Sequence, residues 1–367
     1  MKIFNALFAA SVLAVVFGLL ASKLLHSYWH TEELQLHGQP VFSVAPGAGA
    51  NAVIQKLAQE GILQRPLVAK LALRYFEPRL VLKVGEYQLP ATASRAQLFE
   101  LFASGVSVQY PVTLVEGFSV AEALAAVTAQ RASVGLSSLN TGESTWQVDQ
   151  LARLLSDQAR QLMRAAGVAA PEGQQVEGWF FPDTYHVAKS DSVADIFTRA
   201  HRKMLEVLTL EWSQRQPNLP YNSPYEALIM ASLIEKETGA IEEREAIAGV
   251  FVRRLQKGMR LQTDPTVIYG LGSTYEGNLR RKHLLADTPY NTYTRHGLPP
   301  TPIALPGRGA IRAALNPAEG DALYFVAKGD GRHHFSATFA EHQRAVQQYQ
   351  IQNRRSDYRS SPKAGAG

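Results

Sequence analysis

Cysteine is absent from the 367-residue chain. Its absence excludes a disulfide framework, a cysteine nucleophile, thiolate metal ligands and lipid attachment through a cysteine. Clusters of one charge are also lacking, because the Lys and Arg residues behind the net charge of +5 are scattered. A scattered positive charge is typical of a solvated surface, and it also suits attraction to phospholipid headgroups or an acidic polymer. We find no zinc-finger spacing, basic helix or aromatic RNA-binding signature, so nucleic acid is not expected as a partner.

Long apolar runs are lacking too, with one exception near the N-terminus. Residues 3–22 carry no charge, and a helix of about 20 residues spans about 30 Å, the hydrocarbon thickness of a bilayer. The run is long for a cleaved signal peptide, and Leu19, Leu20 and Ala21 make a poor cleavage site. A cleaved signal peptide is the alternative. We favour an uncleaved transmembrane signal anchor at residues 1–25, with a short cytoplasmic stub and an exported body.

The exported part begins with the pattern of a small mixed module. Hydrophobic residues make up 46% of the chain and charged residues 19%, which suits a globular protein of roughly two domains. After a connector at residues 26–39, we expect strands at 40–44 and 85–89. Helices are expected at 52–60 and 66–75 and from Ser94 to Gly105. Residues 40–108 are therefore predicted to form an α+β subdomain.

A second, larger mixed α/β domain is predicted at residues 109–350, which gives an α+β fold class overall. Strands are expected at 112–115 and 323–326, and helices at 192–213, 224–237, 241–257 and 339–350. Residues 129–175 contain Ser/Gly-rich breaks and are expected at the periphery. The tail at residues 351–367 is rich in Ser, Lys, Arg, Gly and Pro, which predicts disorder.

The helix expected at 224–237 begins with strong signals and ends with two carboxylates. Ser223 fits the N-cap, Pro224 the first helical position and Glu226 the reciprocal capping position. Residues 227–234 are apolar except for one serine, which predicts a buried helix. Glu235 and Glu237 follow at the C-terminal end, where the helix dipole disfavours negative charge.

The two glutamates differ in the helix face they occupy. They point about 160° apart on a helix, so they are not expected to share one site. Glu237 lies on the bulkier apolar stripe, and an apolar wall raises the pKa of a carboxyl group. A raised pKa suits a general acid, which makes Glu237 the better candidate. The alternative is that both glutamates are exposed charges, paired with Lys236 or Arg244.

Polar and aromatic residues are dense in two later segments, 262–266 and 288–294. Amide, hydroxyl and aromatic side chains hold sugars by hydrogen bonding and by stacking on the ring. The proline-rich segment 297–303 is expected to form a rigid extended wall. Ordinary turn and loop chemistry is the alternative for each segment.

Six segments in the same order resemble the endolytic murein transglycosylases, the MltG or YceG-like family. They are LVEG (114–117), EGWFFPDTY (177–185), ASLIEKET (231–238), GMRLQTDPTVIYG (258–270), TPYNTYT (288–294) and GLPPTPI (297–303). With weaker matches at either end, the resemblance spans about two-thirds of the chain. Gly85 and Tyr87 fit the Gly-x-Tyr of the family's LysM-like module, which assigns residues 40–108 to that module and 109–350 to the YceG-like catalytic domain.

The resemblance implies a lytic transglycosylase, a carbon–oxygen lyase that acts on polysaccharide. Such an enzyme cleaves the β-1,4 bond between N-acetylmuramic acid and N-acetylglucosamine within a glycan strand, leaves a 1,6-anhydromuramoyl end, and terminates the elongation of nascent strands. Glu237, the second Glu of the EKET motif, is the implied catalytic residue. It would act first as acid and then as base. The substrate's own C6 hydroxyl is the nucleophile, so the second carboxylate of ordinary glycosidases is not needed.

Other roles follow from the resemblance together with side-chain chemistry. Gln262, Asp264, Tyr290 and Asn291 are the candidates for binding the sugar or orienting Glu237. A histidine near the end of the family pattern corresponds to His333. Its spacing does not suit a zinc site, so no metal and no cofactor are expected.

The implied partners are peptidoglycan glycan strands, the membrane through the N-terminal helix, and peptidoglycan synthases. The implied location is the cell inner membrane, single-pass, with the catalytic body in the periplasm. Two other functions stay open. One is a non-catalytic scaffold that binds the cell wall and synthases, and the other is a hydrolytic muramidase that uses Glu237 and Asp264.

Overall fold

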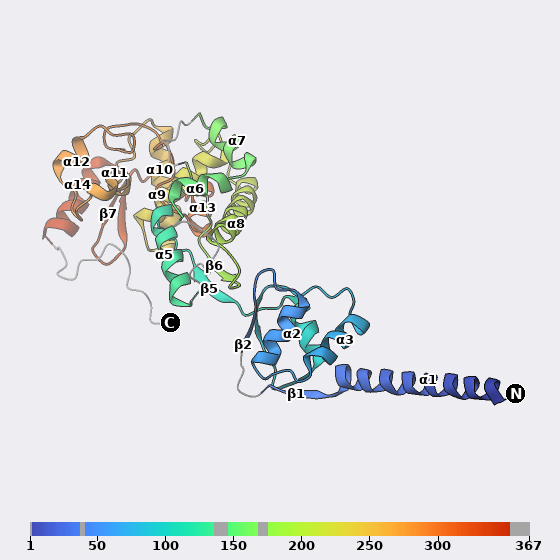
Figure 1. Ribbon diagram of the computed structural model, residues 1–367. Helices are drawn as coiled ribbons and strands as arrows, with labels where there is room; N and C mark the ends of the chain where they lie inside the picture. The colour runs from blue at the N-terminus through green and yellow to red at the C-terminus, as the bar shows by residue number, and fades with distance from the viewer. Residues whose placement is uncertain (1, 37–40, 136–145, 168–174, 353–367) are drawn as a thin grey trace. The chain divides into compact units, whose positions relative to one another are not determined.

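The computed structural model describes residues 2–36, 41–135, 146–167 and 175–352. The chain divides into two compact units, Met1–Pro111 with His186–Asp191, and Val112–Tyr185 with Ser192–Gly367 (Figure 1). The boundary falls within the two-stranded sheet of β5 (Tyr110–Thr113) and β6 (Thr184–Val187). Residues 37–40 of the expected connector and 353–367 of the expected tail lie outside the described residues.

The N-terminal apolar run forms one continuous helix, α1 (Lys2–His26) (Figure 1). Its apolar stretch has a mean hydropathy of 2.1 and none of it is buried against protein, and the helix is long enough to cross a membrane. A signal sequence has the same properties. The residues after α1 differ from the expected polar connector. The π-turn η1 (Ser27–Thr31) buries Tyr28 and Trp29 in the core of the first unit, and β1 (Glu33–Gln35) pairs with β4 (Thr92–Ser94).

The rest of the first unit is a small α+β module. Antiparallel strands β2 (Val41–Val44) and β3 (Gly85–Gln88) pack with helices α2 (Ala50–Gln59), α3 (Pro66–Phe76) and α4 (Arg95–Ser104). Helix α4 begins and ends where the sequence predicts. Ser94 and Gln97 form a reciprocal capping box, and Gly105 adopts the left-handed conformation that closes the helix.

The second unit is mainly helical, with strands only in short pairs. Its elements after β5 are α5 (Val120–Ser133), α6 (Val148–Leu151), η2 (Ala152–Leu154), α7 (Asp157–Ala165), β6, α8 (Val193–Ser213), α9 (Pro224–Glu237), η3 (Ile241–Glu243), α10 (Arg244–Gln256), α11 (Asp264–Leu271), η4 (Gly272–Thr274), α12 (Arg281–Leu285), α13 (Arg308–Leu315), β7 (Tyr324–Ala327), β8 (His333–Ser336), α14 (Phe339–Val346) and η5 (Gln347–Gln352). The α+β class is confirmed. The strands described in this unit pair only in twos, so they do not form the larger sheet that an α/β domain would have.

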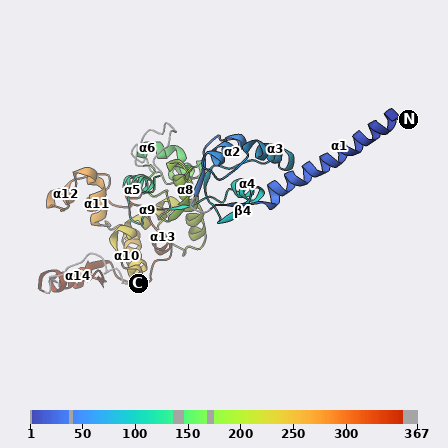
Figure 2. The same cartoon turned by 60° about the horizontal axis from the view of Figure 1, so that its bottom comes forward.

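Helix α9 is the central element of the second unit. It packs against α8, α10, α11 and α13, and Figures 1 and 2 show these helices gathered around it. Every residue from position 227 to 234 is buried, as the apolar run predicts. Ser223 caps the helix by accepting the N–H of Glu226, whereas the Glu226 carboxylate reaches back to the N–H of Asn222 rather than to that of Ser223. Because α9 is held in the core, the position of its last residue, Glu237, is fixed as well.

Some boundaries differ from the sequence predictions. The strand expected at 112–115 begins two residues earlier, as β5. The helix expected at 241–257 starts as a 3-10 turn, η3, before α10 begins at Arg244. The helix expected to continue to residue 350 is α-helical only to Val346 and then widens into the π-turn η5. Helix ends are weakly specified by local sequence, so shifts of this size are expected.

Candidate active site

Helix α9 ends at a pocket of about 550 Å³. This volume lies within the range of about 300–1,000 Å³ that is typical of ligand sites. Side chains from the ends of α9 and α10, from α11, from the β7–β8 pair and from α14 line it. These are Lys236, Glu237, Arg254, Leu261, Gln262, Asp264, Pro265, Ile268, Tyr293, Tyr324, Phe325, Val326, Ala327, His333, Phe339, His342, Val346 and Gln350.

Glu237 is the half-buried acid of this pocket. Burial is the main cause of a pKa raised above the usual value for a glutamate, and the nearby Asp264 adds to the rise. A hydrogen bond from Thr263 and the charges of His333 and Arg254 oppose the rise without cancelling it. Glu237 therefore keeps its proton to a higher pH than an exposed glutamate, as its apolar stripe predicted.

Thr263 orients the Glu237 carboxyl group. Its Oγ1 donates a hydrogen bond of 2.6 Å to Glu237 Oε2. Thr263 is itself fixed, because its N–H donates to Thr292 Oγ1 at 3.1 Å. The preceding Gln262 has a left-handed backbone, with φ of 51°, and its N–H donates to the Thr292 carbonyl at 3.1 Å. A non-glycine residue in this conformation stores strain, and such strain tends to gather at functional sites.

Gln262 and Asp264 lie with Glu237 at the pocket, where the sequence placed them. The Gln262 side chain is exposed and makes no hydrogen bond within the described part of the chain, so its amide is available to a ligand. Asp264 is the first residue of α11 and accepts a 2.6 Å hydrogen bond from the Tyr293 hydroxyl. Tyr293 also lines the pocket, although the sequence analysis did not select it.

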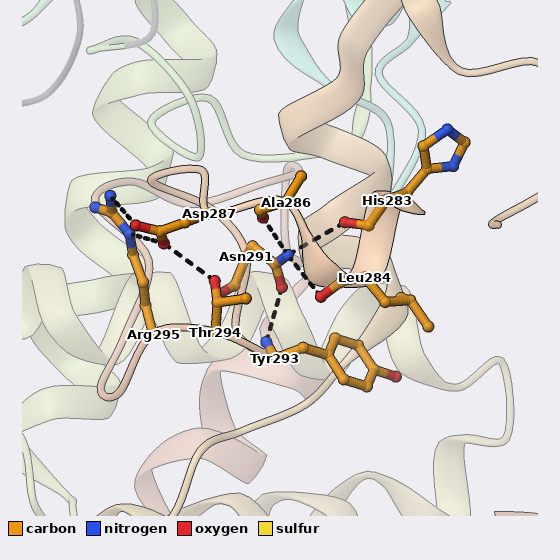
Figure 3. Close-up of polar contacts among 8 residues, drawn as sticks. All are labelled: His283, Leu284, Ala286, Asp287, Asn291, Tyr293, Thr294 and Arg295. Atoms are coloured by element: carbon orange, nitrogen blue, oxygen red, sulfur yellow. Dashed lines mark hydrogen bonds and ion pairs between the residues drawn. The ribbon is translucent and has the colours of Figure 1, made fainter. Parts of the chain in front are cut away.

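Tyr290 and Asn291 do not reach this pocket. Asn291 is fully buried, and its side-chain nitrogen donates to the carbonyls of His283, Leu284 and Ala286 (Figure 3).

Its side-chain oxygen accepts the N–H of Tyr293, so the amide organises its own loop (Figure 3). Tyr290 is 4% exposed, and its hydroxyl lies 2.8 Å from Thr301 Oγ1. Neither side chain lines the pocket, and Asn291 holds the loop that carries Tyr293, so the expected contact of these two residues with sugar stays a prediction.

Glu235 points away from the pocket into an ion pair. Its carboxylate accepts a 2.8 Å hydrogen bond from Arg244 and a 3.0 Å hydrogen bond from the Gly307 N–H. Glu116 approaches the same guanidinium at 3.5 Å. The pairing with Arg244 occurs as the alternative proposed, but it is buried rather than exposed. The two glutamates of the EKET segment thus have separate surroundings, as the helix geometry predicts.

His333 lines the pocket and is held by Glu243. The Glu243 carboxylate lies 2.8 Å from His333 Nδ1 and also accepts the backbone N–H of His333 at 3.0 and 3.1 Å. Sequence reasoning noted His333 by resemblance but missed Glu243, which is 90 residues earlier. Arg254 was also missed. Its guanidinium donates to the carbonyls of Leu323 and Leu261 at 2.7 and 2.8 Å, which ties α10 to the pocket's edge.

Glu177 is a second buried acid, outside the pocket lining. Burial raises the pKa of Glu177 to about 7, although its carboxylate accepts the N–H of Val120 at 2.9 Å and the hydroxyl of Tyr269 at 3.0 Å. It joins the start of α5 to α11, the helix that carries Asp264. This placement indicates a structural role for the EGWFFPDTY segment.

Among the described residues, no group of three or more His, Asp or Glu side chains is arranged to hold a metal ion.

Known proteins resemble this chain over large parts of its length. The chain is 29% identical over 309 residues to the endolytic murein transglycosylase of Bacillus subtilis (strain 168), a match that covers 84% of each protein. It is 33% identical over 181 residues to the endolytic murein transglycosylase of Streptococcus pneumoniae (strain ATCC BAA-255 / R6), which covers 48% of this chain and 32% of that relative. The crystal structure of a YceG-like protein from Listeria monocytogenes matches with a TM-score of 0.51 and 26% identity, covering 86% of this chain and 99% of that one.

A protein-family model also matches most of the chain. It is described as the YceG-like family and matches residues 42–348, which contain Glu237 and most of the pocket lining. The chain therefore belongs to the YceG-like family.

Proposed function

We propose that the chain is an endolytic murein transglycosylase, a lyase that cuts peptidoglycan glycan strands at internal bonds. Its family membership and the names of the relatives from Bacillus subtilis and Streptococcus pneumoniae support this activity. The observation that carries the proposal is the position of Glu237, a half-buried carboxyl group with a raised pKa at the wall of an open pocket. A protonated carboxyl group is what the departure of a sugar oxygen requires.

Glu237 acts twice in the proposed reaction. As an acid, it gives its proton to the glycosidic oxygen while the bond from that oxygen to C1 of N-acetylmuramic acid breaks. As a carboxylate, it takes the proton of the C6 hydroxyl of the same sugar, and O6 then bonds to C1. The product carries a 1,6-anhydro end, no water is consumed, and Glu237 regains its proton. One carboxyl group suffices because the nucleophile belongs to the substrate.

The neighbours of Glu237 have supporting roles. Thr263 holds one carboxyl oxygen, so the other is free to face the glycosidic bond. Gln262 presents an unpaired amide for a sugar hydroxyl or acetamido group, and Asp264 with Tyr293 forms a second polar edge. Asn291 acts indirectly, because its side-chain oxygen accepts the N–H of Tyr293, and Tyr290 is held beside Thr301 outside the pocket lining.

The rest of the chain supports a setting for the reaction. We place α1 in the cell inner membrane as a single-pass anchor, with both units in the periplasm. The length, hydropathy and exposure of α1 support this placement. The first unit, as a LysM-like module, would hold the glycan strand, and peptidoglycan synthases would be partners. Internal cleavage of nascent strands there would terminate their elongation.

Product formation by full-length protein in detergent tests the activity. The protein is expected to release fragments from sacculi and from uncrosslinked glycan strands. Glu237→Gln should abolish release. Glu206→Gln, which changes an exposed glutamate on α8, serves as the matched control and should leave it unchanged. Full activity of Glu237→Gln would contradict the proposal, and binding of glycan without turnover by the unaltered protein would favour a scaffold.

A hydrolytic muramidase is the second candidate, because Asp264 provides another carboxylate in the same pocket. In that reaction water attacks C1 with the help of a second carboxylate, and the product has a reducing end. Asp264 accepts the hydrogen bond of Tyr293, which suits a positioning role better than a base that must hold a water.

A further inference from the structure

Three aromatic side chains form one wall of the pocket that contains Glu237. Tyr324 comes from β7, and Phe339 and His342 come from the first turn of α14. The ring centroids of Tyr324 and His342 are 5.2 Å apart with an interplanar angle of 23°, so these rings are stacked. Phe339 lies 5.8 Å from Tyr324 and 6.4 Å from His342. We call Tyr324, Phe339 and His342 the aromatic wall.

The aromatic wall is fixed from behind. The Arg254 guanidinium lies 5.2 Å from the centre of the Tyr324 ring, and two backbone carbonyls hold that guanidinium. Thr338 caps α14 in a reciprocal capping box with Glu341, which fixes the turn that carries Phe339. Burial and the charge of Arg254 keep the pKa of His342 below its usual value, so its ring is neutral near pH 7. The wall is therefore ordered without a ligand.

Phe339 is the member that local structure does not explain. It is the first residue of α14, and 57% of its surface is exposed. A phenylalanine that is exposed to water loses the favourable free energy that its burial would give. A polar residue would start this helix equally well. An exposed aromatic ring inside a pocket is typical of a ligand contact.

The rest of the pocket defines the chemistry of that ligand. Glu237, Gln262 and Asp264 offer hydrogen-bonding groups, and the aromatic wall offers an apolar face. A pyranose ring has both properties, because its hydroxyl and acetamido groups point outward from its edge while its C–H bonds form an apolar face. Such C–H bonds carry partial positive charge and rest well on the negative face of an aromatic ring. A stem peptide would instead be held mainly by charged groups such as Lys236, which also lines the pocket, and it would not need the three rings.

We propose that the aromatic wall is a sugar-binding subsite, on which a pyranose ring of the glycan strand next to the cleaved bond stacks, with Phe339 as its outermost contact. This subsite rests on the proposed transglycosylase function and adds to it the surface that positions the strand. It binds the strand in both its ground and transition states, so loss of the wall weakens binding more than it slows the chemical step.

The test separates binding from cleavage. Full-length protein in detergent that carries Glu237→Gln is titrated with peptide-free glycan strands by calorimetry, and a free stem peptide is the second probe. Adding Phe339→Ala should raise the Kd for the strands by about tenfold, the loss expected for one stacking contact. Phe339→Trp should keep the Kd within about twofold, because it keeps an aromatic face. Leu285→Ala changes a side chain that is 66% exposed in the same unit and should have no effect.

Three outcomes of these titrations would overturn the subsite. An unchanged Kd for Phe339→Ala would overturn the subsite, and so would Phe339→Leu binding as tightly as Phe339→Trp, because a plain apolar contact would then suffice. Weakened binding of the stem peptide but not of peptide-free strands would also overturn it. The proposed function is judged separately, by whether protein with an intact Glu237 cleaves strands. In that background, Phe339→Ala should raise KM and leave kcat within about twofold.

Discussion

Thr263 Oγ1 and Glu237 Oε2 are joined by a hydrogen bond of 2.6 Å between two segments that are 26 residues apart. The bond connects the last residue of α9 to the residue at the N-cap position of α11. It leaves the second oxygen of Glu237 without a hydrogen bond from the described part of the chain. The carboxyl group is thereby held in one orientation and can still exchange its proton with a ligand in the pocket.

Thr263→Val should damage catalysis and shift its pH dependence. Valine has a similar shape but cannot donate a hydrogen bond. Because the Thr263 bond lowers the Glu237 pKa against the effect of burial, its loss should raise that pKa further. We expect the maximal rate to fall by about tenfold or more, from the loss of one hydrogen bond to a charged group, and the alkaline limb of the pH–rate profile to move to higher pH. Profiles measured on uncrosslinked glycan strands check both effects.

Thr128→Val is the matched control for this change. Its hydroxyl donates to the Leu124 carbonyl within α5, outside the pocket lining. The control should leave the pH–rate profile in place. A Thr263→Val protein with the same profile as the unaltered protein would show that the bond does not tune Glu237.

Glu235 and Glu237 should respond differently to the same substitution, because burial raises the pKa of both carboxyl groups but only Glu235 is the partner of a buried arginine. The raised pKa of Glu237 means that its charged form opposes folding, and this loss of stability sets in as pH rises above the usual glutamate pKa. Glu237→Gln should therefore abolish activity while keeping or increasing Tm at pH 7–8. Glu235→Gln removes the main partner of buried Arg244, and we expect a loss of about 3 kcal/mol of stability.

Thermal and denaturant unfolding of the two variants measure this contrast. Glu116 remains near Arg244 in the Glu235→Gln protein and compensates part of the loss. If Glu237→Gln is the strongly destabilised variant, Glu237 is a structural residue and its assignment as the acid fails.

Local signals predicted the secondary structure of the main helices. The bounds of α9 follow from Ser223, Pro224 and an apolar run, and α4 from Ser94 and Gly105, because caps and burial act within a few residues. The segment after α1 differs from its prediction because Tyr28 and Trp29 lie among polar residues in the sequence and are buried through contacts with α3, α4 and β4. Tertiary packing decided that segment, and local sequence could not.

The candidate site was predicted only in part, because several of its contacts depend on tertiary packing. The helix face of Glu237 could be computed from spacing, and so could its separation from Glu235. The bonds of Glu237 with Thr263 and of His333 with Glu243 span 26 and 90 residues, and only the folded chain brings these groups together. Asn291 was a candidate because the sequence does not distinguish a buried asparagine that fixes a loop from an asparagine that binds sugar. Its three carbonyl acceptors lie at the C-terminal end of α12, and spacing does not reveal this contact.

Glu177 should make the stability of the second unit depend on pH. Its pKa is about 7 in the folded chain against 4.5 for an unperturbed glutamate. The folded state therefore holds this proton more tightly, and the stability it contributes is full below about pH 4.5 and is lost as pH rises through about 7. The difference corresponds to about 3 kcal/mol.

Glu177→Gln removes this titration. Chemical denaturation of the unaltered protein and the variant at a series of pH values between 4.5 and 8.5 gives the two stability curves. Their difference should change by about 3 kcal/mol across that interval, with the unaltered protein gaining relative to the variant as pH falls. Parallel curves would mean that Glu177 is ionised throughout and that burial does not control it.

Asn291→Ala should act on stability more than on the affinity for glycan. The change leaves the carbonyls of His283, Leu284 and Ala286 without their shared donor. We expect a loss of about 1–3 kcal/mol of stability. The affinity of folded protein for glycan should change little at a temperature well below Tm. A variant that melts like the unaltered protein but binds glycan strands poorly would instead support direct contact between Asn291 and the sugar.

The mass of the new ends is the most direct test of the central claim that Glu237 uses the substrate's own C6 hydroxyl. Full-length protein digests uncrosslinked glycan strands in water enriched in ¹⁸O, and mass spectrometry reads the muramoyl end of each fragment. The account predicts ends that are lighter than reducing ends by one water and that contain no ¹⁸O, and it predicts no such ends with Glu237→Gln. Reducing ends that carry ¹⁸O would contradict it and would identify the reaction as hydrolysis.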